Sequence, residues 1–134
     1  ASNNRLDVWG EMRLAALLHK GLSRDPVAVP ATSVLRMATV EGARALGFDD
    51  VGLLREGWQA DLVLVDLDLP HYVGWTPETL CPYLVYAGSS ADVRGTMVQG
   101  KWIYREKNFV TMDITQVKRE SSRCRRELVK DQKD

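Results

Sequence analysis

The sequence contains few of the residues that usually build metal or redox sites. It has two cysteines and two histidines among 134 residues. Cys81 and Cys124 lack metal-ligand spacing, and neither His19 nor His71 has a histidine two or four positions away, as a metal-binding pair would. We therefore expect reduced thiols in a cytoplasmic protein, and histidines that are structural or exposed rather than ligands.

Other absences exclude whole classes of partner. The 18 basic and 18 acidic residues give a formal net charge of zero, so the general basic surface of a nucleic-acid-binding protein is missing. No apolar run approaches the length of a membrane span, and no segment resembles the hydrophobic part of a signal peptide. Glycines occur singly rather than in a phosphate-binding loop. The sequence predicts neither a nucleic-acid nor a membrane partner.

The first residues read as a loop that runs directly into an amphipathic helix. The pattern predicts a helix from about Arg5 to Lys20, with Asn3 or Asn4 as N-cap and Gly21 just past its end. Its apolar residues share one broad face, which needs a large neighbour: Leu6, Trp9, Met12, Ala16 and Leu17, widened by Val8, Ala15 and Leu18. Because the chain opens inside such an element, we expect it to be a piece of a longer protein.

Further elements follow in short segments. Two helices are predicted, at about 32–37 and 40–46, with Thr39 capping the second and Gly47 closing it. Residues 51–54 are expected to be extended, and the apolar run between Asp61 and Asp66 predicts a strand. Segments 93–98 and 101–105 predict a hairpin around Gln99-Gly100, 109–112 a further extended piece, and Asp113 the start of a final helix. The segment from Leu80 to Tyr86 stays ambiguous.

Taken residue by residue, the chain contains no complete active site. Asp61 and Asp66 flank a strand, as solvated strand ends usually do, and Cys81 has no activating neighbours in sequence. We assign no catalytic residue and no metal ligand from the residues alone.

Several motifs together resemble those of metal-dependent amidohydrolases. Similar segments begin with Ser2-Asn3-Asn4 and Glu11 to Lys20, and continue with Leu35-Arg-Met-Ala-Thr39 and Glu41 to Gly47. The block from Gly52 to Asp66 is the most specific, and shorter matches follow at Pro70-His71, Leu84 to Ala87, Asp92-Val93 and Val98 to Lys101. The likeness covers Ala1 to about Asp113 and is greatest to the S-adenosylhomocysteine and 5′-methylthioadenosine deaminase and chlorohydrolase branch.

This resemblance implies an α+β fold for the chain. Residues 1–47 would be the terminal helices of a (β/α)8 barrel, 48–112 part of a small β-sandwich, and 113–134 a C-terminal helix. In that family, histidines and an aspartate bind a divalent metal, zinc or iron, which generates a hydroxide nucleophile. All of these ligands would lie before Ala1. Ser2, Asn3 and Asn4 match a loop that borders the active site, so they are the candidate substrate-binding residues, although helix capping explains them equally well.

Two functions remain open at this stage. The chain is either the C-terminal part of a hydrolytic deaminase of an aminopurine nucleoside or related ring, inactive alone, or a truncated remnant that serves as a non-catalytic interaction module. Its expected partners are the missing N-terminal barrel and, because Trp9, Leu14, Leu17 and Leu18 share one helix, further copies in a homo-oligomer.

Overall fold

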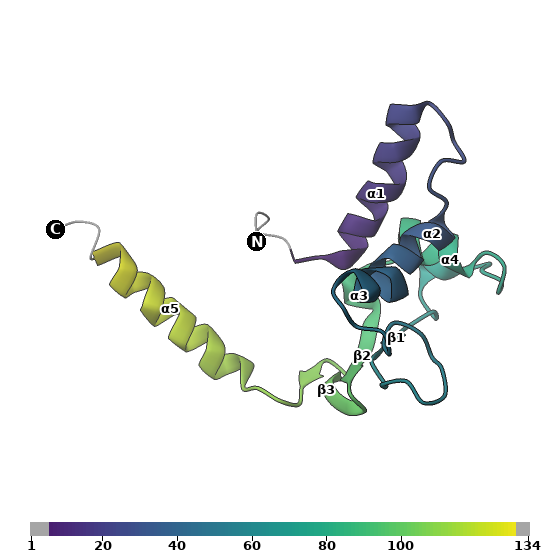
Figure 1. The fold of residues 1–134 in the computed structure, drawn as a ribbon. Helices are drawn as coiled ribbons and strands as arrows, with labels where there is room; N and C mark the ends of the chain where they lie inside the picture. The colour runs from purple at the N-terminus through teal and green to yellow at the C-terminus, as the bar shows by residue number, and fades with distance from the viewer. Residues whose placement is uncertain (1–5, 131–134) are drawn as a thin grey trace.

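The computed structural model describes residues 6–130. Helices dominate the first third of this range, an antiparallel sheet follows, and a long helix projects from the far end of the sheet (Figure 1). In chain order the elements are α1 (Val8–Ser23), α2 (Ala31–Arg36), η1 (Met37–Glu41), α3 (Gly42–Ala45), β1 (Leu62–Val65), η2 (Pro70–Tyr72), α4 (Leu80–Pro82), η3 (Tyr83–Ala87), η4 (Ser90–Asp92), β2 (Val93–Val98), β3 (Lys101–Arg105), β4 (Asn108–Phe109) and α5 (Ile114–Lys130). The expected α+β class is confirmed.

Helix α1 is displaced toward the C-terminus from its predicted position. Its N-cap is Asp7, so the prediction of Asn3 or Asn4 is wrong. The predicted end at Lys20, with Gly21 just past it, is also wrong, because the helix continues through Gly21 to Ser23. Arg24 takes the left-handed conformation with φ 54° and donates its N–H to the carbonyl of Lys20. The left-handed residue at the end of α1 is therefore an arginine. The usual preference for glycine at this position predicted Gly21 instead.

The two short helices predicted after α1 form one helical stretch with a kink. Thr39 leaves helical geometry, with φ −123° and ψ −106°, and its hydroxyl donates to the carbonyl of Leu35 at 2.7 Å. Thr39, the predicted boundary between two helices, is the position of a bend between α2 and α3. The expected extended segment at 51–54 is not a strand: Gly52 has φ 90°, and a Cβ there would lie 2.7 Å from the backbone of Val40. A tight turn packs against the bend instead.

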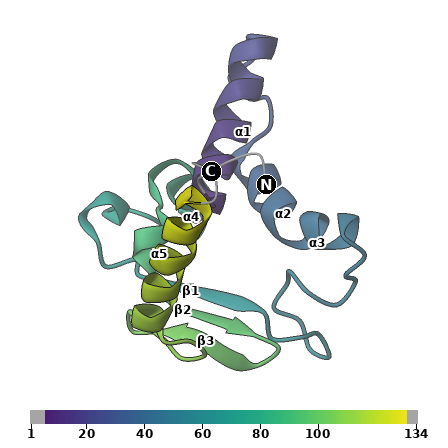
Figure 2. The ribbon, with the colours of Figure 1, turned by 90° about the vertical axis from the view of Figure 1, so that its left-hand side faces the viewer.

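The sheet has four antiparallel strands in the order β1-β2-β3-β4. The predicted β2–β3 hairpin is confirmed, with Val98 paired to Lys101 and Gln99 and Gly100 at φ 49° and 74°. Two successive positive φ angles are the signature of a type I′ turn. The last strand, β4, comprises Asn108–Phe109, at the start of the extended piece predicted for 109–112. Figure 2 shows the sheet at the opposite end of the molecule from the tip of α1.

The buried core lies among the helices rather than on the sheet. Residues 80–87, which include the ambiguous segment from Leu80 to Tyr86, are helical, and they return from the sheet to pack against α1 and α2. The core cluster consists of Met12, Ala16, Ala31, Val34 and Val85. In contrast, Val63 and Leu64 in β1 are 47% and 49% exposed, so the sheet is thinly covered in the described part of the chain.

Much apolar surface is left open in residues 6–130. Leu14, Leu17 and Leu18 of α1 are 50–55% exposed, although Met12 and Ala16 of the same helix are buried. Every residue from 111 to 129, including most of α5, is exposed. Within the described range, no helix is both long enough and apolar enough for a membrane span.

Candidate functional site

The best-defined polar site is a group of four residues, His71, Tyr72, Ser89 and Asp92, which we call the Asp92 cluster. Asp92 is a buried acid, with 5% of its surface exposed. One carboxylate oxygen, Oδ2, lies 3.0 Å from His71 Nε2 and accepts hydrogen bonds from the Tyr72 hydroxyl at 2.9 Å and the Ser89 backbone N–H at 2.8 Å. Three neighbours thus converge on one oxygen.

Local sequence places these side chains. Pro70 opens the short helical turn η2, where its missing N–H costs nothing, and the turn brings His71 and Tyr72 to adjacent positions. Ser89 caps the next such turn, η4: its hydroxyl accepts from the N–H of Ala91 while Asp92 accepts from the N–H of Ser89. This reciprocal capping box fixes the Asp92 side chain.

The surroundings keep Asp92 charged and Tyr72 neutral. Burial alone would raise the pKa of Asp92, but hydrogen bonds from His71, Tyr72 and the Ser89 N–H outweigh it and hold the pKa below its usual value. Burial, followed by the hydrogen bond and the charge of Asp92, raises the pKa of the Tyr72 phenol. A charged acceptor therefore faces a protonated donor, and the opposite pKa shifts favour this pairing over proton transfer between the two groups.

The cluster is tied to the first turns of α1 through Gly88. The guanidinium of Arg13 donates to the carbonyl of Gly88 at 2.6 Å. A Cβ on Gly88 would lie 2.7 Å from Trp9 Nε1 and 2.9 Å from the Tyr72 hydroxyl, so the backbone here is enclosed by both side chains. The Asp92 cluster thus lies against the first turns of α1, through Gly88.

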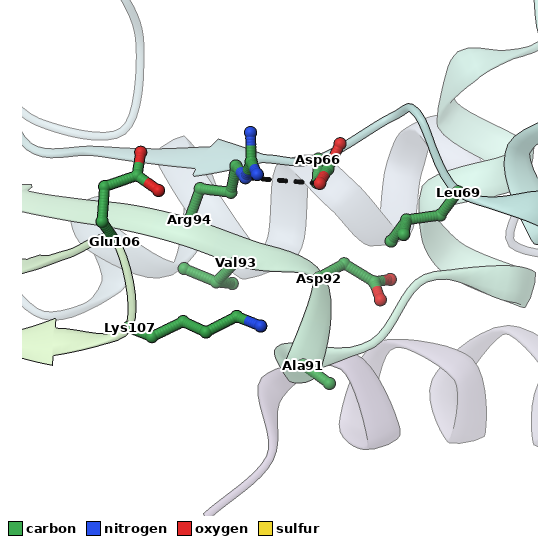
Figure 3. A pocket seen from close by; sticks show the side chains of 8 residues that line it. All are labelled: Asp66, Leu69, Ala91, Asp92, Val93, Arg94, Glu106 and Lys107. Carbon is green, nitrogen blue, oxygen red and sulfur yellow. Dashed lines mark ion pairs between the residues drawn. The ribbon is translucent and has the colours of Figure 1, made fainter.

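A small cleft lies beside the cluster, where β1 and β2 meet the β3–β4 turn. Its volume is about 180 Å³, and Figure 3 shows the eight residues that line it: Asp66, Leu69, Ala91, Asp92, Val93, Arg94, Glu106 and Lys107. Arg94 Nε lies 3.3 Å from Asp66 Oδ2, so part of its charge is already paired. The lining mixes acidic and basic groups and defines no single ligand charge.

The described residues do not provide a metal site. In the range 6–130, no three histidine, cysteine, aspartate or glutamate side chains come together as a possible ligand set. His71 is bound to Asp92 instead, in agreement with the structural role expected for it. Cys81 and Cys124 are both free thiols, as predicted. The candidate substrate residues Ser2, Asn3 and Asn4 lie outside the described residues.

Sequence reasoning missed Asp92 and Tyr72 as a site. Two motifs of the sequence, Pro70-His71 and Asp92-Val93, contain residues of this site. Sequence analysis used them only as evidence for the family resemblance. Because the two motifs are about 20 residues apart, only the fold reveals that they share one carboxylate.

Comparison with known proteins identifies the class. The profile of the amidohydrolase family matches residues 1–103, so the chain belongs to the amidohydrolase family. A 5-methylthioadenosine/S-adenosylhomocysteine deaminase of Dictyoglomus thermophilum is 43% identical over 97% of this chain and 30% of its own length. A 5′-deoxyadenosine deaminase of Methanosarcina mazei is 44% identical over 96% of this chain and 29% of its own length.

Solved structures agree with these relatives. An adenosine deaminase from Xanthomonas campestris with bound zinc superposes with a TM-score of 0.89 and 35% identity, over 97% of this chain and 29% of that one. Atrazine chlorohydrolase from Arthrobacter aurescens, in complex with zinc, gives a TM-score of 0.69 and 29% identity over 85% of this chain and 25% of its own. The deaminase and chlorohydrolase resemblance is confirmed, and the chain spans about 30% of the length of the curated relatives it matches.

Proposed function

We propose that this chain is the C-terminal part of a metal-dependent amidohydrolase that deaminates an aminopurine nucleoside. The observation that carries the proposal is the 43% identity to a methylthioadenosine and S-adenosylhomocysteine deaminase across nearly the whole chain. The relative that acts on 5′-deoxyadenosine, by its name, points to the same ring. In the net reaction, water replaces the exocyclic amine of the purine with oxygen, and ammonia leaves.

We propose further that the helices complete a (β/α)8 barrel and that the sheet is one layer of a β-sandwich. Two observations support this arrangement. The leucines of α1 are half exposed although other residues of the helix are in the core, so that face of the helix suits a neighbouring helix. Strand β1 pairs only with β2 in the described structure, and its other edge is open to a further strand. A longer chain would cover both.

The described residues do not fit the metal that such an enzyme needs, so its ligands would come from the rest of the protein. The contribution of this chain is to hold the start of α1 in place. The Asp92 cluster holds Gly88, Gly88 is packed by Trp9 and bonded to Arg13, and the start of α1 is fixed as a result. We propose that Ser2, Asn3 and Asn4, just before this helix, border the substrate pocket of a cytoplasmic enzyme.

The test is an ammonia-release assay on the full reading frame and on the 134-residue chain, both supplied with zinc. Substrates are adenosine, 5′-deoxyadenosine, 5′-methylthioadenosine and S-adenosylhomocysteine. We expect the full-length protein to deaminate at least one of them, and the 134-residue chain to deaminate none and to retain less than one zinc per chain after dialysis. Ammonia release by the 134-residue chain, or inactivity of a folded, zinc-loaded full-length protein on every aminopurine, would overturn the proposal.

A further inference from the structure

Helix α5 carries a second pattern that the deaminase chemistry does not use. Its 17 residues project away from the helices and the sheet (Figure 1), and the described side chains of the helix are all exposed. The helix is nevertheless well formed at its start, where Asp113 Oδ1 accepts the N–H groups of Thr115 and Gln116 at 2.8 and 3.1 Å. The apolar side of α5 is therefore uncovered in the described part of the chain.

The apolar stripe of α5 follows heptad spacing. With Ile114 as position a, alternating steps of three and four residues give one uncharged stripe: Ile114, Val117, Ser121, Cys124 and Leu128. These are successive a and d positions, the narrow seam that two helices share in a coiled coil. Val129 lies outside this stripe, at position b. The exposed fractions of Ile114, Val117 and Leu128 are 39%, 42% and 66%, so the seam is open.

The residues that flank the seam carry complementary charges. The g positions are acidic, Asp113, Glu120 and Glu127, and the e positions are basic, Lys118 and Arg125. In a parallel pair of helices, each g residue faces the e residue five positions later in the partner. That rule pairs Glu120 with Arg125 of a second copy, which are opposite in charge. Asp113 precedes the first helical residue, and its carboxylate caps the helix. In an antiparallel pair g faces g and e faces e, and every such contact here would join like charges.

We propose that α5 binds α5 of a second copy of this chain as a short parallel coiled coil. The symmetry of a parallel pair closes the assembly at two copies, because each copy contributes the same face. The outer positions suit this arrangement, since Arg119 and Arg126 fall at f and remain in solvent. Ser121 in the seam and a length of about two and a half heptads make the association modest and concentration-dependent.

The first measurement is the mass of the 134-residue chain by sedimentation equilibrium over a range of concentrations. We expect a monomer–dimer equilibrium. Glu120→Lys sets a lysine against Arg125 of the partner on both sides of the seam, and should raise the dimer dissociation constant about tenfold. Arg125→Glu should do the same. The double variant E120K/R125E restores opposite charges in a parallel dimer, and its dissociation constant should return to within about twofold of the starting value.

Arg126→Glu is the matched control for Arg125→Glu. It makes the same charge change one residue away, at an f position that faces solvent, and it should leave the dimer dissociation constant unchanged. Circular dichroism verifies that each variant keeps its helix. A second readout uses a short bismaleimide, which should join the two Cys124 thiols across the seam. The covalent dimer should persist in Cys81→Ser and disappear in Cys124→Ser.

Four results would overturn the proposal, three with the 134-residue chain and one with the full-length protein. One is a monomer at every concentration. Another is a dimer that is insensitive to the charge changes, which would place the contact elsewhere, for instance on the exposed leucines of α1. The third is failure of the double variant to recover. In the full-length protein, a Cys124 thiol that no longer forms the covalent dimer would show that the rest of the enzyme covers the seam of α5 instead.

Discussion

His71 Nε2 lies 3.0 Å from Oδ2 of Asp92, and this contact joins the turn that follows β1 to the residue that precedes β2. The two residues come from segments separated by the helical excursion of α4 and η3. Because the same carboxylate oxygen also accepts from Tyr72 and Ser89, one buried acid closes the loop through which the chain leaves the sheet and returns to it. Four predictions test this and neighbouring features.

Replacing Asp92 with alanine should destabilise the fold strongly. The change leaves the buried Tyr72 hydroxyl and the partly buried Ser89 N–H and His71 without their shared acceptor, and a buried donor without a partner is costly. We expect the free energy of unfolding to fall by roughly 2–4 kcal/mol, measured by urea denaturation. Asp68→Asn, at an exposed aspartate nearby, is the matched control and should change stability little. Equal effects of the two substitutions would contradict the anchoring role.

Stability should fall as the solution becomes acidic, in part through Asp92. The pKa of Asp92 is lowered in the folded protein, so the unfolded chain takes up the proton more readily. The stabilisation is complete above the unfolded pKa of about 4 and is lost as the pH falls through the folded value. Urea midpoints between pH 7 and pH 3 should decrease less steeply for Asp92→Asn than for the unchanged chain. Parallel curves would assign the acid sensitivity to other carboxylates.

Gly88 should tolerate no side chain. A Cβ there would approach the carbonyl oxygen of Leu84, Trp9 Nε1 and the Tyr72 hydroxyl closer than real contacts allow. Gly88→Ala should therefore cost about 1–3 kcal/mol in thermal or urea unfolding. Gly21→Ala is the control: Gly21 lies inside α1 with no atom within 4 Å of the added carbon, and the change should stabilise by about 0.5–1 kcal/mol. Opposite signs for two identical substitutions are the expected result.

The β2–β3 turn should become more stable when its first residue suits the backbone. Gln99 has φ 49°, and asparagine enters this left-handed region more easily than glutamine. Gln99→Asn should raise the free energy of unfolding by a few tenths of a kcal/mol to about 1 kcal/mol, and Gln99→Val should lower it. The hydrogen bond from the backbone N–H of Gln99 to Asp61 Oδ1 is kept in both variants. A gain in stability for valine would refute the turn assignment.

Local sequence rules were most successful where a structure is decided by neighbouring residues. The β2–β3 hairpin follows from alternation around Gln99-Gly100, and Asp113 caps α5 as its residue type and position indicate. They were less successful at the ends of α1, where Arg24 rather than Gly21 takes the left-handed cap. Preferences at helix ends differ by about 1 kcal/mol or less, and packing over the whole helix outweighs them.

The sequence by itself determined the family, the α+β composition, the hairpin and the heptad spacing of α5, because each is written in residues close together in the chain. Only the tertiary structure decided that His71, Tyr72 and Ser89 meet on Asp92, and that residues 80–87 leave the sheet to join the helical core. The reason is that hydrogen bonds to one buried carboxylate depend on where distant segments come together in space, and spacing along the chain does not encode that meeting.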